Sequence, residues 1–211
     1  MFEIEYKGAN CITIATKKAT VVIDPKLSVV GLKDLVIKDA IELSTDERFA
    51  LDSKDARLVI DGPGEYEIAD FSIKGIATTR HIDTDNDPKQ CTLYRIEIGD
   101  SRMVVIGNCK DDLSEQQLED IGVVDMAVIP VGGNGYTLDA TSAVKIARQL
   151  DAKVVIPVHY QDTALSYEVP QDDVEPFLKE FGGEVEHVGK LKIKSGSAIP
   201  MTSTVFVIAR S

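Results

Sequence analysis

The first hundred residues alternate between short apolar runs and polar turns, a pattern typical of β-strands rather than of helices. Phe2 to Tyr6 alternates apolar and polar positions, as expected for a strand with one buried face. A turn at Lys17-Lys18 separates the next two apolar runs. The sequence predicts further strands over residues 11–15, 20–23, 57–60, 66–68, 71–76 and 91–98, with a turn at Asp61-Gly62-Pro63-Gly64.

After residue 100 the pattern changes to alternating strands and helices. Ser114 and Gln117 have the spacing of a capping box, and Gly122 ends the helix that they begin. The sequence also predicts strands over 103–106, 125–130, 154–158 and 205–209, a helix capped by Asp139 or Thr137, and a helix over Val174, Phe177, Leu178 and Phe181 closed by Gly182-Gly183. Strands first, then mixed strands and helices, indicate layered sheets flanked by helices.

The chain has 211 residues, with 23 Lys and Arg against 35 Asp and Glu, and a formal net charge of −12. This length is sufficient for one large domain or two closely packed halves. The acidic balance argues against nucleic acid as a partner, because phosphate backbones attract clustered Lys and Arg. The apolar runs are too short to span a bilayer, so we expect no membrane partner. Three cysteines without zinc-ligand spacing indicate reduced thiols and a cytoplasmic protein.

The three histidines are the first candidates for chemistry. His159 follows the apolar run 154–158, and ligand and catalytic groups gather at strand ends in α/β sheets; a histidine that only satisfies a loop carbonyl is the alternative. His81 ends another apolar run and is either a ligand or a solvated loop residue. His187 is assigned no role. Asn108 follows a strand, where it is either a polar contact in a cleft or a turn residue.

Several segments, taken jointly, resemble one known family. Gly8-Ala9-Asn10-Cys11-Ile12-Thr13-Ile14 and Val22-Ile23-Asp24-Pro25 look like the opening of metallo-β-lactamase-fold proteins. The later matches, in the same order and spacing, are Asp61-Gly62-Pro63-Gly64-Glu65-Tyr66-Glu67-Ile68, Ile129-Pro130-Val131-Gly132-Gly133, Tyr136-Thr137-Leu138-Asp139-Ala140 and Ile156-Pro157-Val158-His159-Tyr160. The match is to the branch of predicted zinc-dependent hydrolases similar to ascorbate-6-phosphate lactonases. It implies one domain over residues 1–211, an α/β fold built as a four-layer αββα sandwich with halves of about 1–100 and 101–211.

In that family a His-x-His-x-Asp-His motif, a further His, a bridging Asp and a final His hold two zinc ions. Carried over by position, the resemblance places Thr45, Glu47 and Ala50 at the three histidine positions of the motif and Phe49 at its aspartate. Asn108 stands at the bridging Asp. Only His81 and His159 remain as histidines at the family's ligand positions. Phe49 and Ala50 carry no donor atom, whereas Glu47 could still bind a metal. A four-ligand zinc site contributes about 10–16 kcal/mol, so losing most ligands should abolish useful affinity.

We therefore expect a metallo-β-lactamase-fold protein with a degraded dinuclear zinc site that acts as a binding, regulatory or assembly module. The alternative is a hydrolase of a small ester, lactone or phosphodiester that uses one metal or none. In that alternative His159 is a ligand or general base, His81 a second ligand and Glu47 a third participant. We expect no cofactor, or else one weakly bound zinc or manganese ion on these three residues. A second copy of the chain or a protein partner is the expected interaction, and the sequence identifies no small-molecule ligand.

Overall fold

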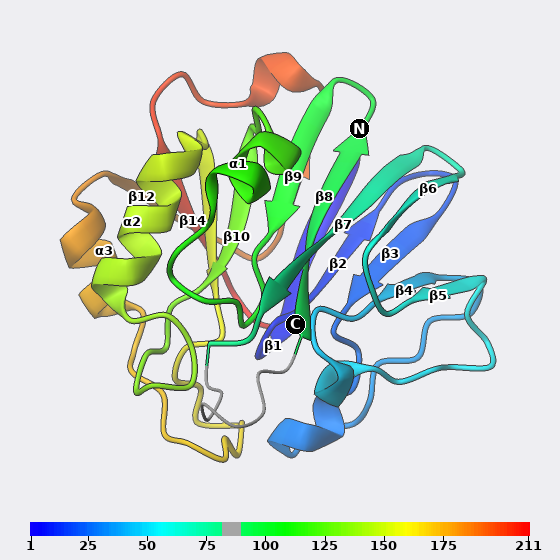
Figure 1. Cartoon of the computed structure of the whole chain (residues 1–211), viewed down its shortest axis with the longest axis horizontal. Helices are drawn as coiled ribbons and strands as arrows, with labels where there is room; N and C mark the ends of the chain where they lie inside the picture. Colours follow the sequence, from blue (N-terminus) through cyan, green and yellow to red (C-terminus); the bar gives the residue numbers. More distant parts are fainter. Residues whose placement is uncertain (82–89) are drawn as a thin grey trace.

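The computed structural model describes residues 1–81 and 90–211, which form two β-sheets packed face to face (Figure 1). The six-stranded sheet contains, in spatial order, β13 (Leu191–Ile193), β1 (Phe2–Gly8), β2 (Cys11–Ala15), β3 (Thr20–Ile23), β4 (Ile41–Leu43) and β5 (Leu58–Ile60). The eight-stranded sheet contains β12 (Glu184–Val188), β14 (Thr204–Ile208), β11 (Val154–Val158), β10 (Met126–Pro130), β9 (Ser101–Val105), β8 (Gln90–Ile98), β7 (Phe71–Thr79) and β6 (Gly64–Ile68).

The main core lies between the two sheets and follows the predicted alternation of apolar and polar residues. Phe2, Ile4 and Tyr6 of β1 are buried in this core, while the residues between them are partly exposed. Ile12 and Ile14 of β2 join them from the neighbouring strand. Because side chains alternate across a strand, this pattern fixes which face of each strand points inward.

Three α-helices cover the outer face of the eight-stranded sheet, where they bury a second apolar cluster. They are α1 (Glu115–Ile121), α2 (Ala140–Leu150) and α3 (Glu175–Phe181), and Figure 1 shows them together on the left, away from β2–β5. The predicted capping box of Ser114 and Gln117 is confirmed, and Asp139 rather than Thr137 caps α2. Among the described residues, no helix has the length and apolar character required to cross a membrane.

The outer face of the six-stranded sheet differs from the expected four-layer sandwich. Its apolar cluster is covered by the 3₁₀ turn η1 (Leu27–Val30), by the irregular chain near Leu35 and by Leu165, with no α-helix among the described residues. Gly31 ends η1 in the left-handed conformation, with φ of 81°, and so stops this turn from continuing as a helix. The α/β class and the two central sheets are confirmed, and the fourth layer is thinner than predicted.

The strand β4 was not predicted from the sequence, and the parallel strands of both sheets matter for the site. β4 has only three residues, too few for a recognisable pattern, and it lies parallel to β3 and β5. In the other sheet β9, β10, β11 and β14 are also parallel. The remaining 3₁₀ turns are η2 (Glu47–Phe49) and η3 (Gly196–Ala198). Parallel strands release their following loops at the same edge, which is where ligand sites form in α/β sheets.

Candidate functional site

The loops that follow parallel strands of both sheets meet at one edge of the sandwich, the lower edge in Figure 1. Thr45 follows β4 and Gly107 follows β9; a Cβ atom built on Gly107 would lie 2.6 Å from the Thr45 Cβ. His159 follows β11 directly, and its backbone N–H donates to the Ala9 carbonyl at 2.8 Å. These contacts join strand ends from the two sheets, so this edge is the candidate site.

Asp24, buried directly after β3, holds the loop that follows β4. Its carboxylate accepts hydrogen bonds from the Thr45 backbone N–H and from Thr45 Oγ1, both at 2.7 Å. Burial raises the pKa of Asp24 to about 7, against the opposing effect of the two bonds from Thr45. The Thr45 hydroxyl, at a position where the resemblance expects a zinc ligand, is therefore committed to a neighbouring side chain.

Asn108, at the expected position of the bridging aspartate, is fully buried and paired with another amide. Asn10 Nδ2 donates to Asn108 Oδ1 at 3.1 Å, which occupies the carbonyl oxygen that could face a cation. Asn108 Nδ2 has no hydrogen-bond partner among the described residues. The backbone N–H of His81 donates to the backbone carbonyl of Asn108 at 2.8 Å, so His81 also lies at this edge. Its side chain is partly exposed.

The imidazole of His159 is fully buried among three aromatic rings. The ring centroids of Tyr167, Tyr136 and Phe49 lie 5.0, 5.5 and 6.2 Å from that of His159, with Tyr167 stacked and Phe49 edge-on. Neither ring nitrogen of His159 has a hydrogen-bond partner among the described residues. Burial, together with the nearby Arg48 cation, lowers the pKa of His159 to about 3, so the ring is neutral at physiological pH.

A charged network that sequence reasoning missed lies beside these rings. The Asp46 side chain is 1% exposed and accepts hydrogen bonds from Arg48 Nε at 3.2 Å and Nη2 at 3.0 Å. Arg80 Nη1 reaches the same carboxylate oxygen at 3.4 Å. Arg48 Nη1 also donates to Tyr136 Oη at 2.7 Å. Asp46 and Arg48 fall between the family's ligand positions, and their only sequence signal was an acid and a base two residues apart.

Asp46 also explains why the chain turns here. Its side chain caps η2 by accepting a hydrogen bond from the Arg48 backbone N–H at 3.1 Å. The turn directs Phe49 into the interior, where its side chain is 1% exposed, and leaves Glu47 exposed. Ala50 ends the turn and donates its backbone N–H to the Glu47 carbonyl at 3.2 Å. At the expected motif, Asp46 therefore anchors the turn, Phe49 fills the core and Glu47 faces outward.

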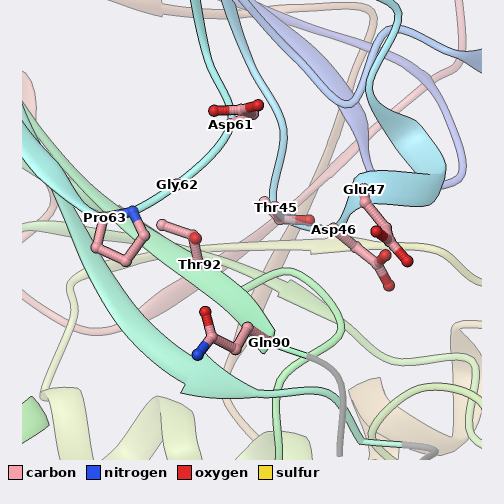
Figure 2. A pocket seen from close by; sticks show the side chains of 8 residues that line it. All are labelled: Thr45, Asp46, Glu47, Asp61, Gly62, Pro63, Gln90 and Thr92. Atoms are coloured by element: carbon pink, nitrogen blue, oxygen red, sulfur yellow. The ribbon is translucent and has the colours of Figure 1, made fainter.

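A polar cleft opens beside η2, with a volume of about 480 Å³. It is lined by Thr45, Asp46, Glu47, Asp61, Gly62, Pro63, Gln90 and Thr92. Figure 2 shows the 45–47 segment facing the Asp61-Gly62-Pro63 turn and the β8 side chains Gln90 and Thr92. His159 and His81 are not among the lining residues, so this cleft combines carboxylates, hydroxyls and an amide without an imidazole.

The sequence-predicted candidates share this edge but do not form one cluster. Within residues 1–81 and 90–211, no three His, Cys, Asp or Glu side chains are grouped so that they could hold a metal ion. Glu47 lines the polar cleft, His81 lies beside the Asn108 backbone, and His159 packs against aromatic rings. The set of Glu47, His81 and His159 is therefore not assembled as a three-ligand group in this structure.

Comparison with known proteins places this architecture in a family. A sequence model described as a beta-lactamase superfamily domain matches residues 3–159, well over half of the 211 residues. This chain belongs to the beta-lactamase superfamily. The matched region runs from β1 through the loop after β4 and ends at His159, so it includes most of the candidate site.

Solved structures share the fold over all or nearly all of the chain. A protein from Thermotoga maritima, assigned to the Zn-dependent hydrolases of the metallo-β-lactamase superfamily, is 24% identical, with a TM-score of 0.77 and coverage of 100% of both chains. Igni18, a metallo hydrolase from Ignicoccus hospitalis, is 14% identical with a TM-score of 0.63, over 99% of this chain and 95% of that one. At these identities the likeness establishes the fold alone.

A relative found by sequence covers less. A metal-dependent hydrolase of Natranaerobius thermophilus is 38% identical over 63 residues, which are 30% of this chain and 26% of that protein. The chain thus matches about a quarter of the length of this curated relative. These comparisons establish membership of the superfamily and a hydrolase-like fold. They do not establish which reaction, if any, this chain catalyses.

Proposed function

We propose that this protein keeps the superfamily fold without the two-zinc reaction and acts as a binding, regulatory or assembly module. The observation that carries the proposal is the environment of His159, whose imidazole is enclosed by Phe49, Tyr136 and Tyr167. None of these side chains belongs to the histidine, cysteine and carboxylate set that normally binds zinc. The guanidinium of Arg48 lies close enough to lower the pKa of His159 and would repel a dication.

The other donors at this edge fit a dinuclear centre no better. Phe49 and Ala50 offer no ligand atom, and the Thr45 hydroxyl is a neutral group already bonded to Asp24. The Asn108 carbonyl oxygen accepts from Asn10 and carries no charge to bridge two cations. Each structural zinc ligand contributes on the order of 3 kcal/mol, so a site that lacks most of them would hold metal weakly. The residues do not fit a two-zinc group.

Metal analysis tests this proposal. The untagged protein is supplied with Zn²⁺ and Mn²⁺, dialysed, and analysed for bound metal per chain. We expect well under one equivalent, and the same low value for His159→Ala and for His187→Ala, a control on the exposed strand β12. Two tightly held equivalents would contradict the proposal. If the wild-type protein holds metal that is lost in His159→Ala but kept in His187→Ala, the result would favour the alternative function described next.

The alternative is a hydrolase of a small ester, lactone or phosphodiester that uses one metal or none. The relatives described as metal-dependent hydrolases favour it, and His159 would be its metal ligand or general base, since its ring is neutral at physiological pH. A screen of such substrates separates the two functions. Turnover that survives chelator but is lost in His159→Ala, and kept in His187→Ala, would establish metal-free general-base catalysis.

We propose further that the protein works in the cytoplasm with a protein partner or a second copy of itself. Cys11, Cys91 and Cys109 are buried and carry no disulfide, as expected of thiols in a reducing compartment. The net charge of −12 makes nucleic acid an unfavourable partner. Light scattering of the purified chain at increasing concentration tests self-association, which a constant monomer mass would contradict.

A further inference from the structure

A second, smaller pocket uses the residues that follow Glu47 in the same turn, and we call it the aromatic pocket. Its volume is about 240 Å³. Two valines of η1 complete a lining whose distinctive members are Phe49, Tyr136, Tyr167, Lys26, Arg48 and Glu168. Small-molecule sites usually occupy about 300–1,000 Å³, so this pocket is suited to a ligand with one ring.

The walls of the aromatic pocket are held in place by named contacts. Tyr136 receives the 2.7 Å hydrogen bond from Arg48 Nη1, and the guanidinium carbon lies 5.0 Å from the Tyr136 ring centroid. Tyr167 Oη donates to the Tyr160 carbonyl at 2.9 Å, which fixes the opposite wall. The backbone N–H of Lys26 donates to the Phe49 carbonyl at 3.2 Å and joins η1 to η2. Such a preorganised pocket needs little ordering when a ligand binds.

The charges around the pocket favour an anion. Three of the five N–H groups of Arg48 point to Asp46 and Tyr136, which leaves two without a partner among the described residues. The ammonium of Lys26 likewise has no hydrogen bond or ion pair within that part of the chain. Arg80 adds a second cation on the Asp46 carboxylate. Glu168 is the one acidic residue among the described residues of the lining, and it is exposed.

The aromatic pocket borders the buried His159, which is not itself one of the lining residues. His159 contacts all three aromatic rings that line the pocket, and both of its ring nitrogens lack a partner among the described residues. A buried polar group left unpaired costs about 1–3 kcal/mol, and an apolar ring would fill the same volume without that cost. The same three rings therefore enclose His159 and line the aromatic pocket.

We propose that the aromatic pocket binds a single-ring aromatic carboxylate. The ring of the ligand lies among Phe49, Tyr136 and Tyr167, and its carboxylate accepts hydrogen bonds from Lys26 and from the outer N–H groups of Arg48. Aromatic faces provide most of the contact area, and charge-assisted hydrogen bonds orient the acid. The inference rests on the proposed function as a binding module and names the class of its ligand.

Binding of benzoate and 4-hydroxybenzoate to the full chain, measured by calorimetry and saturation-transfer NMR, tests the inference. We expect both acids to bind. Benzamide and cyclohexanecarboxylate should bind at least about tenfold more weakly, because benzamide lacks the negative charge and cyclohexanecarboxylate lacks the aromatic ring. Lys26→Met and Tyr167→Leu should each weaken benzoate binding by at least about tenfold. Lys54→Met changes an exposed lysine outside the pocket lining; it is the matched control and should leave benzoate binding unchanged.

The outcomes separate this inference from the proposed function. Equal binding of benzamide and benzoate, or benzoate binding that both pocket variants retain, would overturn the aromatic-carboxylate assignment. Circular dichroism establishes that each variant is folded, and Lys26→Gln provides a second change at a partly exposed position if Tyr167→Leu unfolds. A metal-poor protein that ignores every aromatic acid would overturn only the ligand class. Two tight equivalents of zinc in the same preparation would overturn the proposed function.

Discussion

Arg48 and Tyr136, 88 residues apart in the sequence, are joined by a 2.7 Å hydrogen bond and by stacking of the guanidinium over the phenol ring. The pair links the turn after β4 to the loop after β10, and so connects the two sheets at the candidate site. The Asp46 side chain, which is 1% exposed, completes the arrangement by forming ion pairs with both Arg48 and Arg80. Charge at this edge is therefore balanced by guanidinium groups of the chain itself.

Arg48→Met should destabilise the protein by about 1–3 kcal/mol, because among the described residues it leaves Arg80 as the one cation paired with the buried Asp46 carboxylate, and it removes the bond to Tyr136. The partial exposure of Arg48 keeps the effect below that of a fully buried pair. Urea denaturation measures it. Arg57→Met, which breaks an exposed ion pair with Asp39, is the control and should change stability by less than about 0.5 kcal/mol.

His159→Phe should leave stability unchanged or raise it by up to about 1 kcal/mol, because it replaces an unpaired buried imidazole with a ring of similar shape. Denaturation with and without Zn²⁺ measures the effect, and the two curves of each protein should coincide. His187→Phe on the exposed strand β12 is the control. A zinc-dependent stabilisation of the wild-type protein that His159→Phe removes would show instead that this imidazole binds metal.

The sequence predicted the strands and helices better than it predicted the arrangement of the site. Period-two burial in β1 and the capping box at Ser114 are local patterns, and both were predictable. The enclosure of His159 depends on Tyr167, which lies in a loop that folds against the imidazole. No pattern in the sequence predicts that contact. The Arg48–Tyr136 bond similarly joins segments far apart in sequence. Long-range packing of side chains at loop ends, rather than any local propensity, determines this edge.

Gly132→Ala should destabilise the protein by more than about 2 kcal/mol. A Cβ atom at Gly132 would lie 2.3 Å from the His159 carbonyl oxygen and 2.4 Å from Gln171 Oε1, so the loop that carries His159 would have to move. Thermal unfolding measures the loss. Gly189→Ala is the matched control, since no atom of the described residues lies within 4 Å of a Cβ atom built there. An equal effect of both substitutions would contradict the steric argument.

Asp24→Asn should change the pH dependence of stability in a defined direction. Burial raises the pKa of Asp24 to about 7 in the folded protein, above its ordinary value of 3.8. The folded state therefore holds this proton more tightly than the unfolded chain, and the stability that it contributes is complete below pH 3.8 and lost as the pH rises to 7. Asparagine resembles the protonated acid and does not titrate, so it removes this loss.

The stability of Asp24→Asn relative to the wild-type protein should accordingly increase between pH 4 and pH 8 by more than about 1.4 kcal/mol, the equivalent of one pKa unit. Urea denaturation at several pH values in constant ionic strength measures this difference. Asp61→Asn removes an exposed carboxylate at the same edge, and its difference from the wild-type protein should stay constant within about 0.5 kcal/mol. Parallel pH profiles for Asp24→Asn and the wild-type protein would mean that Asp24 is ionised in the folded state throughout this range, with the bonds from Thr45 outweighing its burial.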